Sequence, residues 1–191
     1  MLYIGRDKPI LRVPVEPDSK QDADLNGPKE DDLISLARET LAQLEARGLT
    51  LAVGESLTGG LIGHALTETP GTSRVFLGSV VAYDNRLKER LGVTRETLNT
   101  YGAVSEQAAV EMAQGVRDWT GADIGLAVTG IAGPGAATDA KPVGLTFIAV
   151  ADKTDIACER HHWGEDRSAN KLRTAEAALS LLIRRLTETS A

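Results

Sequence analysis

This sequence of 191 residues has few cysteine and aromatic residues, and it has no excess of positive charge. The single cysteine, Cys158, excludes an intrachain disulfide and is compatible with a reducing cytosol, so we expect a cytoplasmic protein. A formal net charge of -6 gives no general attraction to nucleic acid or to an anionic membrane surface. Aromatic residues make up only 4% of the chain, which argues against a platform for stacking bases.

Long apolar runs are also missing. No run approaches the ~20 apolar residues that a membrane helix needs, and the first residues lack the pattern of a secretion signal. Cysteine and histidine are not spaced as zinc ligands, so we expect no metal and no other cofactor. The hydrophobic fraction of 42% and the charged fraction of 25% are typical of a globular protein, and the length is sufficient to bury a core.

Residues 1–30 differ from the rest of the chain, since they contain four of its seven prolines. We interpret residues 14–30 as a tether with little structure. Leu2–Ile4 and Ile10–Val13 could form short extended pieces, and the first segment could dock as an edge strand. The domain itself is predicted to span residues 31–188.

Within that domain, segments of helical periodicity alternate with short apolar runs. Helices are expected over residues 31–47, 58–67, 84–91, 105–120 and 166–188, and strands over 49–54, 79–83, 124–129, 143–151 and 156–163. The last two strands form an antiparallel hairpin around the turn at 152–155. The order predicts an α/β protein: a three-layer α/β/α sandwich on a mixed, mostly parallel central sheet that ends in the hairpin.

Residues 54–60, Gly-Glu-Ser-Leu-Thr-Gly-Gly, hold a hydroxyl between glycines where a strand gives way to a helix. The N–H groups at a helix start point outward and favour negative charge, and glycines allow close approach to the backbone. The turn therefore suits a nucleophile, Ser56, or an anion-binding site. An ordinary strand-to-helix turn with a Ser or Thr cap is an equally weighted alternative.

A serine nucleophile needs a base at neutral pH. The three histidines are poorly placed for this, so a Ser-His-Asp triad is not expected: His64, His161 and His162. A lysine can serve when burial lowers its pKa toward neutral, and Lys88 follows a strand end. Tyr83 could relay a proton or orient the substrate. The alternatives are a solvated helix lysine and a half-buried aromatic residue at a sheet edge.

A glycine-rich loop follows Thr129 at the end of another strand. Residues 130–136 have neither the G-x-G-x-x-G spacing nor a Walker A pattern. The loop, with Gly130 and Gly133, could hold a phosphate or a developing oxyanion through its backbone; a plain long connection is the alternative. Ligands of α/β sheets collect outside the carboxyl ends of the strands, where this loop, the Ser56 turn and the segment of Lys88 could converge.

Several of these segments together resemble the CinA C-terminal domain family. The resemblance depends on residues 52–61 (AVGESLTGGL), 81–85 with Lys88 and 91–93, 101–105 (YGAVS), 127–134 (AVTGIAGP) and 141–144 (KPVG). It covers about residues 31–188, in order and at the expected spacing.

The resemblance implies an activity similar to that of nicotinamide-nucleotide amidohydrolases, which convert nicotinamide mononucleotide and water to nicotinate mononucleotide and ammonia. It implies Ser56 as the nucleophile, with Lys88 and Tyr83 as its activating partners. The substrate-binding residues expected around them are Thr58, Gly59, Gly60, Thr129, Gly130, Gly133, Arg167 and Lys171.

Two departures from the family pattern bear on substrate binding. Ala136-Ala137-Thr138 stands where the family usually continues with glycines, and Lys171 stands where a second arginine is common. Many relatives also carry a large N-terminal nucleotide-hydrolase domain. This chain is too short for one, so we expect a stand-alone amidohydrolase.

Two other interpretations stay open: an amidase for another small nucleotide, and a non-catalytic partner-binding module related to competence or DNA damage. The partner expected for the enzyme is a small-molecule nucleotide, with no nucleic acid and no membrane. We also expect a homo-oligomer, with a dimer favoured.

Overall fold

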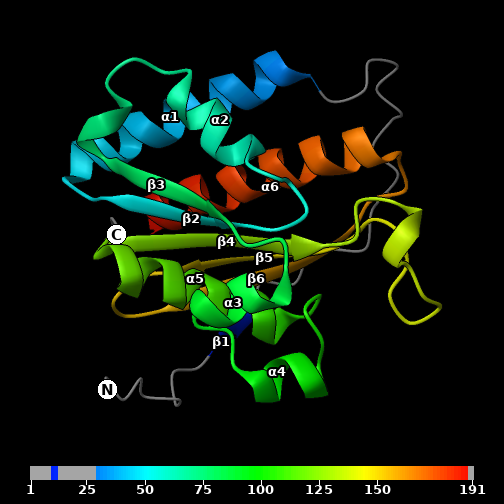
Figure 1. Ribbon diagram of the computed structural model, residues 1–191. Helices are drawn as coiled ribbons and strands as arrows, with labels where there is room; N and C mark the ends of the chain where they lie inside the picture. Colours follow the sequence, from blue (N-terminus) through cyan, green and yellow to red (C-terminus); the bar gives the residue numbers. More distant parts are fainter. Residues whose placement is uncertain (1–9, 13–28, 189–191) are drawn as a thin grey trace.

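The computed structural model, which describes residues 10–12 and 29–188, is a three-layer α/β/α sandwich (Figure 1). Its strands are β1 (Ile10–Arg12), β2 (Leu51–Glu55), β3 (Phe76–Val81), β4 (Ile124–Gly130), β5 (Leu145–Ala151) and β6 (Ile156–His162). Its α-helices are α1 (Glu30–Arg47), α2 (Leu61–Thr67), α3 (Asn85–Arg90), α4 (Arg95–Thr100), α5 (Glu106–Thr120) and α6 (Arg167–Glu188). Two short 3-10 helices, η1 (Thr72–Arg74) and η2 (Pro134–Ala136), lie in the connections.

The strands form one sheet in the order β1-β6-β5-β4-β2-β3. β2 runs parallel to both β3 and β4, and β1 runs parallel to β6. β5 is antiparallel to its neighbours β4 and β6. The predicted fold class is thus confirmed, including the hairpin of β5 and β6.

The two faces of the sheet carry side chains of different size, because neighbouring residues of a strand point to opposite faces. Leucine, valine and isoleucine side chains, such as Val53, Leu126 and Ile148, pack against the layer of α1, α2 and α6. Alanines at the adjacent positions, Ala52 and Ala127 among them, face α5 on the other side (Figure 1). The alanine face lets α5 approach the sheet closely.

Several element boundaries differ from the prediction. α2 begins at Leu61 instead of residue 58, because residues 56–60 form a turn in which Gly59 and Gly60 have positive φ. β3 ends at Val81 instead of Tyr83, and the helix α4 was not predicted. Asp84 and Ser105 cap α3 and α5, since each side chain accepts a backbone N–H of its helix.

The segment before the domain was predicted as a tether that an edge strand could precede. The structure shows an edge strand at Ile10–Arg12, within the second of the two predicted extended pieces, which pairs with the first residues of β6, Ile156–Cys158. Leu2–Ile4 and residues 14–28 of the predicted tether lie outside the described part of the chain, and Glu30, which was assigned to the tether, is the first residue of α1. Across residues 10–12 and 29–188, no helix combines the length and the apolar character required to cross a bilayer.

Candidate active site

Ser56 follows directly on the last residue of β2 and is only 7% exposed. Its backbone N–H donates to Val128 O at 3.1 Å, which ties it to the neighbouring strand β4. Its carbonyl accepts from Gly59 N at 3.2 Å, which closes the turn. The hydroxyl is therefore held at the carboxyl end of the sheet by a fixed backbone.

Glu55, the residue before Ser56, is completely buried and was not singled out from the sequence. Its Oε2 accepts from Thr58 Oγ1 (2.7 Å), Gly60 N (2.9 Å) and Ile62 N (3.2 Å), while its Oε1 accepts from Gly63 N (2.9 Å) and Ser79 Oγ (2.6 Å). The N–H groups at the start of α2 are thus occupied by a carboxylate of the chain itself. This corrects the expectation that they are free to bind a substrate anion.

Lys88 lies in α3 with its side chain buried, at 2% exposure. Its Nζ donates to Ala82 O at 2.6 Å and to Tyr83 O at 2.9 Å. Burial lowers the pKa of Lys88 from 10.5 to about 8, and the nearby charge of Asp84 opposes this shift only in part. The structure thus excludes the alternative of a solvated helix lysine.

Tyr83 contacts Lys88 through its backbone carbonyl, whereas the residue as a whole is 66% exposed. The half-buried aromatic residue that was one alternative is therefore not what the structure shows. No hydrogen bond involves the phenol among the described residues, so a proton relay through Tyr83 has no support in the geometry. Tyr83 thus contacts Lys88 through its main chain, and its predicted role in orienting the substrate stays a prediction.

Thr129 is buried near the end of β4, and its hydroxyl donates to Ala103 O at 2.7 Å. Lys141 donates from Nζ to Tyr101 O (2.5 Å) and Val104 O (2.8 Å), which ties the loop after β4 to the same segment. Asn170 of α6 donates to Ala132 O at 2.9 Å and holds the loop from the other side. The glycine-rich loop is therefore fastened to two neighbouring elements.

These segments enclose a cavity of about 190 Å³ at the carboxyl ends of β2 and β4. Seven of the eleven predicted site residues line it, including the proposed pair Ser56 and Lys88; the other five are Tyr83, Thr129, Gly130, Gly133 and Arg167. Its other lining residues, which the sequence did not point to, are Leu57, Asn85, Ala103, Val104, Ile131 and Ala132.

The remaining four predicted residues, Thr58, Gly59, Gly60 and Lys171, do not line this cavity. Thr58 and Gly60 donate to the Glu55 carboxylate and so support the turn from behind. Lys171 lies beside the turn, since its Nζ is 3.7 Å from the position that a Cβ on Gly59 would take. Arg167 is exposed, and its guanidinium packs against Gly133, where an added Cβ would lie 2.9 Å from Nε.

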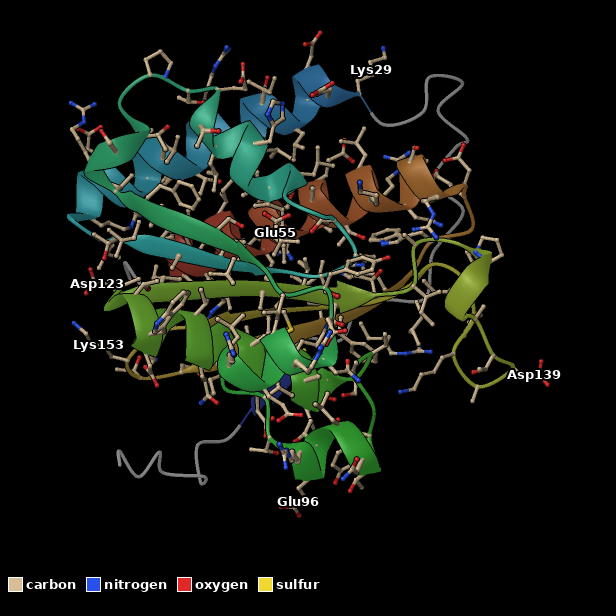
Figure 2. All side chains as sticks on the ribbon, viewed as in Figure 1. Lys29, Glu55, Glu96, Asp123, Asp139 and Lys153 are labelled. Atoms are coloured by element: carbon tan, nitrogen blue, oxygen red, sulfur yellow. The ribbon has the colours of Figure 1, made fainter. Side chains whose placement is uncertain are left out.

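The histidines lie away from Ser56, as the sequence predicted. His64 faces Glu30, His161 contacts Glu159, and His162 contacts Val143 O. A larger hollow of about 350 Å³ lies at the opposite end of the sheet, near Asp123 and Lys153 (Figure 2). None of the predicted site residues lines it, so the smaller cavity is the candidate active site.

The family model of the CinA C-terminal domain matches residues 33–186. A CinA-like protein of Salinibacter ruber is 47% identical over 155 residues, which are 78% of this chain and 38% of that protein. A CinA-like protein of Dictyoglomus thermophilum is 39% identical over 202 aligned residues, covering 96% of this chain and 48% of that protein. The chain therefore spans less than half the length of these curated relatives.

Solved structures agree with this relationship. The competence/damage inducible protein CihA of Agrobacterium tumefaciens is 41% identical, with a TM-score of 0.78 over 80% of this chain and 94% of that one. A CinA superfamily protein of Klebsiella pneumoniae is 31% identical, with a TM-score of 0.79 over 82% of this chain and 98% of that one. The match extends over almost all of the described α/β sandwich, and this chain belongs to the CinA C-terminal domain family.

Proposed function

We propose that this chain hydrolyses the carboxamide of nicotinamide mononucleotide, giving nicotinate mononucleotide and ammonia, with Ser56 as nucleophile and Lys88 as base. The observation that carries the proposal is a buried amine with a pKa lowered to about 8 in the same cavity as a buried serine hydroxyl. Lysines tuned in this way act as general bases near neutral pH.

The hydrogen bonds of Lys88 suit it to accept a proton. A neutral amine has two hydrogens and one lone pair. Two backbone carbonyls, of Ala82 and Tyr83, accept from Nζ. When the amine is neutral, both hydrogens are engaged, and the lone pair is left to take the proton of Ser56.

The reaction then proceeds in two steps. Ser56 Oγ attacks the carboxamide carbon as its proton passes to Lys88. The C–N bond breaks, and the nitrogen leaves as ammonia with the proton from Lys88. Water attacks the resulting ester, and its proton returns through Lys88 to Ser56 Oγ as the acid is released.

The developing oxyanion needs hydrogen-bond donors close to Ser56. Among the described residues, the backbone N–H groups of Leu57 and Thr58 have no hydrogen-bond partner. They follow the nucleophile directly, as the donors of hydrolase turns often do. We assign the oxyanion to the N–H of Leu57, which lines the cavity, and losing one such donor typically costs ~10²–10³ in rate.

The phosphate of the substrate fits the exposed guanidinium of Arg167 at the cavity. A planar guanidinium can bind two phosphate oxygens at once. Lys171 lies near the turn and adds positive charge on the same side. These two cations give the site its preference for a nucleotide over a free nicotinamide.

The test is ammonia release from nicotinamide mononucleotide by the purified chain and by Ser56→Ala. We expect turnover by the wild type and none above background by the variant, because the nucleophile is missing. The circular dichroism spectrum and melting temperature of the variant should match the wild type, since only one oxygen is removed.

Near-wild-type ammonia release by Ser56→Ala would contradict the nucleophile assignment. No ammonia or acid from the wild type on any nicotinamide substrate would instead favour the non-catalytic module.

A further inference from the structure

Glu55 is the most heavily hydrogen-bonded carboxylate next to the cavity, yet it does not line the cavity and the proposed reaction does not use it. Figure 2 shows it inside the molecule beneath α2, whereas Glu96, Asp139 and Lys153 lie at the surface. Burial of a charged group is costly unless its hydrogen-bonding capacity is met. Its five donors meet that capacity, and they come from the turn, from α2 and from β3.

All five partners of Glu55 are donors, so an acceptor-only group is required at this position. Three of them are backbone N–H groups at the start of α2, from the cap residue Gly60 and from Ile62 and Gly63, and such groups have no partner within the helix itself. The other two are the hydroxyls of Thr58 and Ser79. The carboxylate therefore joins the nucleophile turn, the helix after it and the edge strand β3.

The backbone around Glu55 is shaped for this contact. Gly63 lies so close to β3 that an added Cβ would be 2.8 Å from Ser79 Cβ and 3.4 Å from Glu55 Oε1. Glu55 O accepts from Ala82 N at 2.7 Å, and Ala82 also supplies one of the two carbonyls that accept from Lys88 Nζ. One residue thus borders both the turn of Ser56 and the segment that positions the amine.

We infer that Glu55 is a positioning residue, which fixes the Ser56 hydroxyl and the Leu57 N–H group relative to Lys88. The inference rests on the proposed function for the role of Ser56. A misplacement of reacting groups by about 1 Å can cost roughly a hundredfold in rate. Loss of the carboxylate should therefore reduce catalysis far more than it reduces substrate binding.

The decisive variant is Glu55→Gln. It keeps the shape of the side chain but replaces one carboxylate oxygen with an NH₂ group, which would face the hydrogen-bond donors around it. We expect kcat for nicotinamide mononucleotide to fall roughly a hundredfold with KM changed less than about threefold. Glu159→Gln is the matched control. Glu159 is also a buried carboxylate, but its partners are His161 and Arg184, which belong neither to the Ser56 turn nor to the segment that holds Lys88, so its loss should leave kcat unchanged.

A second readout does not depend on the substrate. A fluorophosphonate probe labels an activated serine, and mass spectrometry identifies Ser56 as the labelled residue. We expect Glu55→Gln to be labelled roughly a hundredfold more slowly than the wild type and Glu159→Gln at the wild-type rate. Ser79→Ala removes one of the five donors and should give an intermediate rate; it decides the question if Glu55→Gln does not fold.

The outcomes separate the two proposals. A folded Glu55→Gln or Ser79→Ala that is labelled and turns over at the wild-type rate overturns the positioning role and leaves the proposed function standing. If wild-type Ser56 is labelled but the mononucleotide is not hydrolysed, the proposed substrate is wrong. The labelling rates of the variants then decide whether Glu55 is a positioning residue. A wild type that is never labelled at Ser56 overturns both.

Discussion

At the scale of single residues, the proposed chemistry depends on how burial changes the pKa of Lys88. An exposed lysine is protonated at neutral pH and cannot accept a proton. Desolvation lowers the pKa of Lys88 to about 8, which brings the neutral amine within reach near neutral pH. The two backbone carbonyls fix where that amine lies.

We therefore predict a pH dependence of kcat/KM set by Lys88. Because the neutral amine is the active form, kcat/KM should rise about tenfold per pH unit well below the pKa and level off above about pH 8. The measurement is ammonia release between pH 5.5 and 9.5 in constant ionic strength.

Lys88→Arg provides the contrast, since a guanidinium stays protonated throughout that range. We expect the variant to lose roughly 10²–10⁴ in rate without a pH-dependent recovery. A wild-type profile that is flat from pH 6 to 9 would rule out Lys88 as the base.

At the scale of elements, α5 packs against residues 91 and 92, which directly follow α3, and this contact fixes where α3 lies. Gly115 of α5 meets the backbone there, and an added Cβ would lie 1.6 Å from Leu91 O. Gly125 of β4 is equally tight against α5, with Ala113 O at 2.0 Å from its Cβ position. Glycines at these points let α5 pack on the alanine face of the sheet.

Gly115→Ala should therefore destabilise the fold and shift α3, which carries Lys88. We expect a loss of about 1–3 kcal/mol in the free energy of unfolding, as is typical of overpacking, together with a lower kcat. Urea denaturation and kinetics on the same preparation measure both. Gly164→Ala is the control, because no atom lies within 4 Å of its Cβ position and its φ is not positive.

At the scale of the whole molecule, charge opposes binding of the substrate. The chain has a net charge of -6, so its overall field repels a nucleotide phosphate. Attraction must come from the cations near the cavity, Arg167 above all. Under the proposed function, a preference for the phosphorylated substrate would be a local property of the site.

We predict that Arg167→Gln raises KM for nicotinamide mononucleotide while leaving KM for nicotinamide riboside, which has no phosphate, nearly unchanged. Steady-state kinetics on both substrates test this. Arg160→Gln changes the net charge equally but does not line the cavity, so it should have no effect on either KM. An equal rise for both substrates would place the phosphate elsewhere.

Much of this protein follows from local sequence patterns. Apart from α4, the helices and strands of the domain and the turn that carries Ser56 can be predicted, because hydrophobic periodicity and turn signals act over a few residues. The convergence of Ser56, Lys88 and Thr129 also follows, since carboxyl strand ends share one edge of a sheet.

The tertiary structure alone decided which group each residue uses. Tyr83 holds Lys88 with its carbonyl, Thr58 and Gly60 turn to Glu55, and Asn170 and Lys141 fasten a distant loop. The contacts of Asn170 and Lys141 join segments far apart in the chain, whereas those of Lys88 and Glu55 are local in sequence. The geometry of both kinds depends on how closely the helices pack on the sheet. A sequence pattern records residue types and spacing, whereas burial and hydrogen-bond partners are fixed only when the layers come together.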